Sequence, residues 1–115
     1  MEKISSSICL AGDIGVSGNM YGGRLLYLMD EAAAIYAMRY SGEKRMVSRK
    51  FSEVEFRYPV HTGDVLEFYA DNPVRGTTSL SFDILVMVDG LLKFHSNCTF
   101  VAVGEDGRKK VINWQ

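Results

Sequence analysis

The sequence has no excess of charge of either sign. Thirteen basic and fourteen acidic side chains give its 115 residues a formal net charge of −1 and an isoelectric point near 6.1. Proteins that bind nucleic acid usually carry a strongly basic face. We therefore expect no nucleic acid among the partners of this protein.

Cysteine is scarce, because only Cys9 and Cys98 are present and no Cys-x-x-Cys pair occurs. His61 and His95 do not complete a metal-ligand pattern with them. The sequence thus predicts no metal site. Two isolated thiols are typical of a reduced cytosolic protein, and we expect both to be at least partly buried.

Long hydrophobic runs are also missing. The most apolar stretch, Leu25–Met38, is interrupted by Asp30 and Glu31 and is shorter than the roughly 20 apolar residues that cross a bilayer. The first residues, Met1–Ser5, contain no apolar signal region. We expect a cytoplasmic protein that neither enters a membrane nor is exported.

What is present fits one globular domain over residues 1–115, because 47% of the residues are hydrophobic and can form a sizeable core. Met20–Tyr40 contains many Leu, Met and Ala residues and no Pro, which predicts one long helix that Ser41 and Gly42 end. This helix is apolar almost all the way round, so we expect protein to wrap it on all sides.

The chain after Lys44 alternates between apolar and polar residues, as half-buried strands do. Strands are predicted at residues 54–60, 65–70, 78–88 and 92–102, and an additional one before the helix at 4–11. Asp71-Asn72-Pro73 is expected to break the second of these, and Asp89-Gly90 is a two-residue hairpin turn. The prediction is an α+β fold, in which a curved antiparallel sheet wraps around one long central helix.

Asp30 is the first candidate for chemistry. On a helical wheel, Arg24, Glu31 and Arg39 form the solvent stripe, whereas Asp30 shares another sector with Gly23 and with small and apolar residues. Burial of an unpaired carboxylate costs several kcal/mol or forces protonation. Asp30 is therefore either a functional group or a carboxylate with a structural partner at the rim or at a subunit interface.

Gly22 and Gly23 open the helix and share the face of Asp30. Free N–H groups at a helix start carry a positive partial charge, which suits a carbonyl oxygen that becomes an oxyanion. Alternatively, the two glycines only serve a loop that needs a positive φ.

Two basic segments are candidates for phosphate binding. Arg75-Gly76-Thr77-Thr78 offers one cation and two hydroxyls, and Arg108-Lys109-Lys110 is a short basic run near the C-terminus. Each is equally compatible with an ordinary solvated turn. His61 and His95 are interpreted as solvated side chains, and neither a Gly-x-Ser-x-Gly elbow nor a phosphate-binding glycine loop is present.

These residues also carry a resemblance. The segment GNMYGGRLL at 18–26, followed by MDEA at 29–32, resembles the opening of acyl-CoA thioesterases of the hot-dog fold, in the group of YciA-like enzymes and brain acyl-CoA hydrolase. Phe56-x-x-Pro59-x-x-x-Gly63-Asp64, the RGTTS segment at 75–79 and TFVAV at 99–103 with Asp106-Gly107-Arg108 resemble later signatures of that family. The resemblance extends over almost the whole chain.

The resemblance implies that Asp30 is the catalytic carboxylate and that Gly22 or Gly23 offers its backbone N–H to a thioester carbonyl. It implies hydrolysis of acyl-CoA without a separate cofactor, because coenzyme A is part of the substrate. It also implies an obligate homodimer, with sites where the helix of one subunit meets the sheet of the other, and further assembly such as a trimer of dimers.

One position departs from the family pattern. Many members carry Asn seven residues before the first glycine of the pair, where this sequence has Gly15. Asn19 or Ser17 can replace that polar contact. Gly15 equally fits a protein that binds acyl-CoA without hydrolysing it. A dehydratase of the same fold is disfavoured, because it needs a histidine near the helix start.

Overall fold

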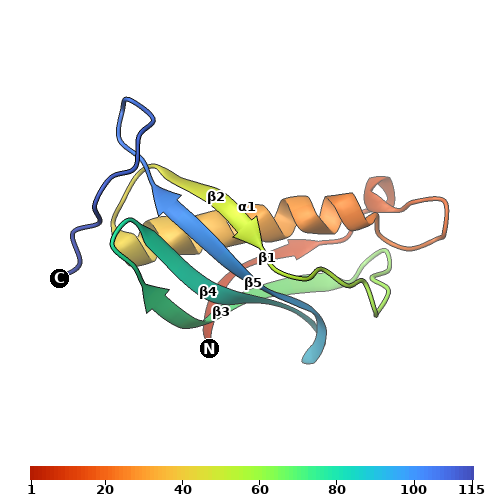
Figure 1. Cartoon of the computed structure of the whole chain (residues 1–115). Helices are drawn as coiled ribbons and strands as arrows, with labels where there is room; N and C mark the ends of the chain where they lie inside the picture. The colour runs from red at the N-terminus through yellow and green to blue at the C-terminus, as the bar shows by residue number, and fades with distance from the viewer.

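The computed structural model of this chain describes residues 1–115 and contains one sheet and one long helix (Figure 1). The five strands pair antiparallel throughout, in the order β1-β3-β4-β5-β2, which confirms the predicted α+β architecture. The elements are β1 (Glu2–Ile8), the 3₁₀ turn η1 (Ala11–Asp13), α1 (Gly22–Ser41), β2 (Met46–Phe51), β3 (Val65–Arg75), β4 (Ser79–Val88) and β5 (Leu91–Ala102).

Helix α1 lies across the inner face of the curved sheet (Figure 1). It supplies seven of the 24 residues of the hydrophobic core. Every second residue of β4 from Leu80 to Val88 is buried against it, as the alternation predicts. The helix ends at Gly42, whose φ of 75° is left-handed. The sheet covers only one side of α1, however, so Tyr27 is 59% exposed. The expectation that protein wraps the helix on all sides is therefore wrong for the single chain.

The strand after the helix lies earlier than the sequence predicts. Met46–Phe51 forms β2 on the edge of β5, whereas residues 54–60 are irregular, so the strand expected there is absent. Backbone pairing with β5 stops at Ser52: its N–H still donates to the Asn97 carbonyl over 2.8 Å, but the Asn97 N–H donates to the Ser52 hydroxyl over 3.0 Å, and that hydroxyl lies 3.3 Å from the Ser96 hydroxyl. The Ser52 side chain thus accepts the hydrogen bond that a backbone carbonyl would accept in a continuing strand.

The predicted break at Asp71-Asn72-Pro73 is a bulge instead. Strand β3 continues through it to Arg75, with a register shift between Asp71 and Val74. Asn72 adopts a φ of 52°, and its side-chain amide donates to Asp83 Oδ2 over 2.9 Å. Asn tolerates this left-handed conformation better than most residues, so the strand bends without ending.

Other details follow the sequence closely. Asp89 and Gly90 have positive φ angles and join β4 to β5, as predicted for a two-residue hairpin. Cys9 and Cys98 are free and buried. One difference is that strand β1 ends at Ile8 and not at Ala11, where the turn η1 begins. Helix α1 does not combine the length and apolarity needed to cross a membrane.

Candidate active site at the start of the helix

The start of α1 presents unused hydrogen-bond donors. The first helical hydrogen bond runs from the Leu25 N–H to the Tyr21 carbonyl over 3.0 Å, which leaves the N–H groups of Gly22, Gly23 and Arg24 without a helical acceptor. Tyr21 is the N-cap residue, and its side chain makes no capping hydrogen bond.

The glycine pair is not there for a positive φ. The glycines with positive φ are Gly18, Gly42, Gly63, Gly90 and Gly107, so the loop explanation does not apply to Gly22 and Gly23. A Cβ at Gly23 would meet no atom within 4 Å, and one at Gly22 would lie 3.0 Å from the ring of Phe56. No side chain therefore occupies the Cβ position of Gly23, and only this ring approaches the Cβ position of Gly22.

A pocket of about 330 Å³ lies beside the helix start. Ser17 and Asn19 line it together with Gly22, so the structure brings the predicted residues Asn19 and Gly22 together, whereas Gly23 is not part of the lining. The other lining residues are Met20, Leu25, Phe56, Arg57, Tyr58, Pro59 and Val60. Neither histidine belongs to this lining, which agrees with the interpretation of His61 and His95 as solvated.

Tyr21 occupies the space beside Gly15. A Cβ placed on Gly15 would lie 2.8 Å from Tyr21 Cε1, which is closer than real Cβ atoms approach another heavy atom. Gly15 also donates its N–H to the Asn19 carbonyl over 2.8 Å, which closes the small loop before the helix. Any side chain at position 15 thus requires the half-exposed Tyr21 ring to move.

Asp30 is half-buried on the sheet-facing edge of α1 and takes part in none of the ion pairs of the chain. It lies close enough to the buried Cys98 on β5 to contribute to the raised pKa of that thiol, which burial raises most, to about 12. Glu31 and Arg39 are exposed, as the predicted solvent stripe requires, whereas Arg24 of the same stripe is only half-exposed because it pairs with Asp13. Seven residues separate Asp30 from Gly23, which is about 10 Å along a helix.

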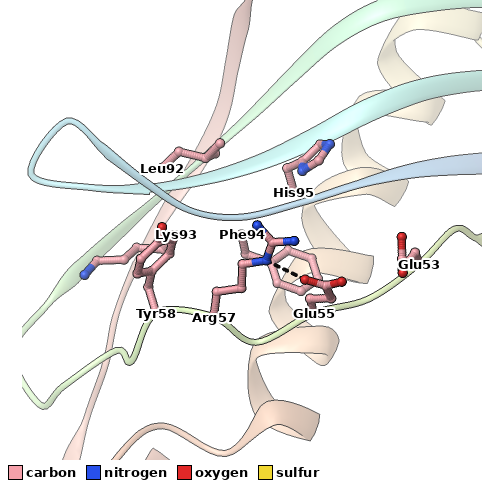
Figure 2. Close-up of a pocket in the computed structure, with 8 residues that line it drawn as sticks. All are labelled: Glu53, Glu55, Arg57, Tyr58, Leu92, Lys93, Phe94 and His95. Atoms are coloured by element: carbon pink, nitrogen blue, oxygen red, sulfur yellow. Dashed lines mark hydrogen bonds and ion pairs between the residues drawn. The ribbon is translucent and has the colours of Figure 1, made fainter.

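A second pocket, of about 380 Å³, lies between the irregular segment and the first half of β5. Figure 2 shows Glu55, Arg57 and Tyr58 on one side and Phe94 on the other, with Glu55 and Arg57 paired. Its remaining lining residues are Glu53, Leu92, Lys93 and His95. Arg57 and Tyr58 line both pockets, so the two lie next to each other.

The predicted basic residues lie at the far end of the helix. Arg75 packs its guanidinium over the rings of Tyr40 and Trp114, with centroid distances of 5.4 and 5.0 Å. The C-terminal segment runs beside the Gly76–Thr78 turn, where the Ile112 N–H donates to the Thr77 carbonyl over 2.9 Å and the Trp114 indole N–H to the Gly76 carbonyl over 2.8 Å. The two basic segments of the sequence therefore both lie at this end of the helix (Figure 1).

Within that group, Lys110 pairs with Glu43 over 2.7 Å, whereas Arg108 and Lys109 are exposed in the turn after β5. Tyr40 is 18 residues beyond Gly22, which is about 27 Å along a helix. The structure thus does not bring the basic residues of one chain to the glycine pair of that chain.

The family model of the thioesterase superfamily matches residues 17–103, which include the glycine pair, Asp30 and every strand after the helix. The chain belongs to the thioesterase superfamily.

Members of this superfamily with similar sequences include the acyl-CoA thioester hydrolase YciA of Salmonella typhimurium, which is 34% identical over 87 residues. That match covers 76% of this chain and 65% of the relative, so the chain spans slightly less than two thirds of that protein. Protein VdlD of Helicobacter pylori is 31% identical over 94 residues, which cover 78% of this chain and 53% of that protein.

Solved thioesterase structures share the fold. A hexameric thioesterase from Yersinia pestis superposes with a TM-score of 0.90 at 26% identity, covering 99% of this chain and 97% of the other. A hexameric hotdog fold thioesterase of Campylobacter jejuni gives 0.87 at 29% identity, covering 98% and 91%. An acyl-CoA hydrolase from Staphylococcus aureus in complex with butyryl coenzyme A and coenzyme A gives 0.80 at 31%, covering 94% and 66%. The superfamily member described here therefore has the hot-dog fold.

Sequence reasoning missed two residues of this thioesterase-superfamily site. Phe56 was part of a motif, but no pattern showed that its ring reaches Gly22 from a segment 34 residues away. Asp13 bonds to Arg24 across the loop that contains Gly15, with 2.9 Å between Oδ1 and Nε. Asp13 is buried, but no sequence pattern distinguishes it from the other acidic residues among the fourteen in the chain.

Proposed function

We propose that this protein hydrolyses acyl-CoA thioesters to a free acid and coenzyme A. The observation that carries the proposal is that one helix presents both open backbone N–H groups, at Gly22 and Gly23, and a half-buried carboxylate without an ion-pair partner, Asp30. The resemblance of the segment that contains them to acyl-CoA thioester hydrolases supports the choice of substrate.

The reaction uses these groups in complementary ways. Attack on the thioester carbonyl places negative charge on its oxygen, which the N–H groups of Gly22 or Gly23 stabilise; one such donor contributes a factor of about 10²–10³ in rate. Ionised Asp30 either takes a proton from the attacking water or attacks the carbonyl itself to form an anhydride, which water then opens. In both routes the carbon–sulfur bond breaks and the coenzyme A thiolate leaves.

A site between two copies fits this geometry. Gly23 and Asp30 of one helix lie about 10 Å apart, too far to contact one carbonyl group together. In a homodimer, the helix start of one subunit and Asp30 of the other complete one site. Similar proteins are described as hexameric, which supports a trimer of dimers as the next level of assembly.

The far end of α1 is assigned to the phosphates of coenzyme A. Arg75, with the turn to Thr78, and Arg108, Lys109 and Lys110 supply the cations that phosphate prefers. Because these groups lie about 27 Å from the glycine pair of their own chain, they serve the site of another copy. The reaction needs no metal and no separate cofactor, and we assign the protein to the cytoplasm.

The decisive test is the release of thiol from a panel of acyl-CoA substrates of different chain lengths. We expect purified protein to release coenzyme A from at least one of them at a rate proportional to protein concentration. Binding of coenzyme A by calorimetry, with no thiol released from any substrate, contradicts hydrolysis.

The packing of Tyr21 beside Gly15 favours a second candidate, a protein that binds acyl-CoA without hydrolysing it. The ring fills the place of the side chain that many family members have there. The substitutions Gly15→Asn and Tyr21→Ala, made together, remove the clash and restore the amide. If the wild type is inactive and this double variant hydrolyses acyl-CoA, the second candidate is the correct one.

A further inference from the structure

We propose that Asp13 is a positioning residue that aims the open N–H groups of Gly22 and Gly23 at the substrate. The inference rests on the proposed hydrolysis and adds a residue to that site. Asp13 ends the turn η1, and its side chain is only 12% exposed. A carboxylate this buried needs hydrogen-bond partners, and those partners connect it to the helix start.

Asp13 accepts three hydrogen bonds. Its Oδ2 accepts the Leu10 N–H over 2.8 Å, its Oδ1 accepts the Arg24 Nε–H over 2.9 Å, and its main-chain carbonyl accepts the Tyr21 N–H over 2.9 Å. Tyr21 and Arg24 are the residues directly before and after the glycine pair. One residue therefore holds both flanks of Gly22–Gly23.

The glycine pair has few other contacts to hold it. Glycine loses more backbone freedom on folding than any other residue, and two in succession make a helix start easy to distort. The N-cap residue contributes no side-chain hydrogen bond, and no atom lies within 4 Å of the Cβ position of Gly23. The Cβ position of Gly22 is approached by the ring of Phe56, which is itself 52% exposed. The direction of the two N–H groups thus depends on the anchored flanks.

Arg24 keeps the charge of Asp13 from opposing an oxyanion. Its guanidinium lies between the carboxylate, 2.9 Å from Nε, and the ring of Tyr27, whose centroid is 5.1 Å away. The pair is neutral as a whole, so the helix start retains its positive partial charge. Asp13 and Arg24 together fix the orientation of the donors without reducing their attraction for negative charge.

The other end of the same helix offers a matched control. Glu43, just after α1, pairs with Lys110 over 2.7 Å, and its side chain is also 12% exposed. Replacing either carboxylate by its amide removes one charge from a comparable ion pair. Only Asp13 touches the residues that flank Gly22 and Gly23, so the two variants separate positioning from general stability.

The test compares Asp13→Asn, Arg24→Gln and Glu43→Gln with the wild type. We expect both substitutions at the Asp13–Arg24 pair to lower kcat by about 10- to 100-fold, as displaced oxyanion donors do, while KM stays unchanged. Combined, they should lower kcat no further than either alone, because they break one contact. The ¹⁵N order parameters of the Gly22 and Gly23 amides should fall in the same variants. Glu43→Gln should keep kcat and both order parameters.

Two results overturn the inference. The first is that Asp13→Asn and Arg24→Gln keep the wild-type kcat and rigid glycine amides. The second is that Glu43→Gln loses as much kcat as they do, in proportion to its loss of melting temperature. Arg24→Gln keeps the bond from the Leu10 N–H to Asp13, so it provides a folded variant if Asp13→Asn does not fold. A wild type that hydrolyses no acyl-CoA overturns the proposed function instead, and the amide order parameters then decide whether Asp13 fixes the glycine pair.

Discussion

The ring of Phe56 lies against Gly22, the first residue of α1, where a Cβ would be 3.0 Å from Cζ of the ring. On its other side the same ring packs on Phe94 of β5, with 5.7 Å between centroids. Phe56 lines the pocket beside the helix start, and its neighbours Glu55 and Arg57 line the pocket against β5. One side chain therefore forms the boundary between two pockets.

This boundary predicts a role in chain-length preference. The change Phe56→Ala should join the pockets of about 330 and 380 Å³, so that longer acyl chains gain room. We expect kcat/KM to rise for long acyl-CoA relative to short acyl-CoA, at a cost in stability of about 3 kcal/mol or less because the ring is half-exposed. The measurement is kcat/KM over a series of chain lengths. An unchanged profile would show that the acyl chain does not pass Phe56.

Asp30→Asn tests the proposed chemistry directly. Asn is nearly isosteric with Asp, so the fold and the binding of coenzyme A should persist while the base or nucleophile is lost. We expect kcat to fall by at least the 10²–10⁴-fold typical of general base catalysis. Melting temperature and coenzyme A affinity are measured on the same sample. Hydrolysis at the wild-type rate would be incompatible with a catalytic role for Asp30.

Lys109 gives the cleanest test of the phosphate contacts, because it is exposed and pairs with no acidic side chain, whereas Arg75 also packs on two rings. Lys109→Glu should raise KM for acyl-CoA with little change in kcat, since a phosphate contact is the same in the ground and transition states. The effect should weaken at high salt. Lys3→Gln on the edge strand β1 is the control, and it should leave KM unaltered. A KM that Lys109→Glu does not change would remove this end of the helix from the binding site.

Asp83 predicts a pH dependence of stability. Hydrogen bonds from the side chains of Asn72 and then Asn97 hold the pKa of its carboxyl below the ordinary value of 3.8. A carboxyl with a lowered pKa in the folded state contributes stability that is complete above the unfolded pKa. That contribution is lost as the pH falls through the folded pKa, because the unfolded chain binds the proton first.

The substitution Asn72→Gly removes the first of these donors, and glycine adopts the φ of 52° without strain. We expect a loss of about 1 kcal/mol in the free energy of unfolding at pH 7. The difference from the wild type should shrink as the pH falls below 3.8 and passes the lowered pKa of folded Asp83, because its carboxyl then becomes protonated in the folded wild type as well. Urea unfolding at pH 7 and pH 2.5 measures it. An equal difference at both values would show that the loss comes from the backbone alone.

Local signals were sufficient for the helix and for the hairpin between β4 and β5. The helix ends at a glycine that takes the left-handed conformation, and Asp89-Gly90 fits the turn that joins two twisted strands. In both cases the deciding interaction lies within a few residues. The sector that separates Asp30 from Glu31 and Arg39 is also a local property, since it depends only on the helical repeat.

The features that the sequence did not predict depend on tertiary interactions. Residues 54–60 alternate like a strand, but Ser52 has already ended the pairing with β5, so Phe56 is free to turn toward the helix. The Asp13–Arg24 contact joins two sides of a loop, and no spacing rule connects residues eleven apart across a turn. The part of the site built on long-range contacts was therefore beyond the sequence alone.

Because both cysteines are buried, the protein's own thiols should contribute little signal to an assay that measures released thiol. Thiolate is the reactive form, and burial raises the pKa of Cys9 above its usual value and that of Cys98 to about 12. Both thiols are therefore less ionised than an exposed cysteine at the same pH. A chromogenic disulfide reagent should therefore detect the thiol of released coenzyme A and not the protein thiols while the fold is intact. Labelling of the two protein thiols in turn reports the fraction of molecules that have opened.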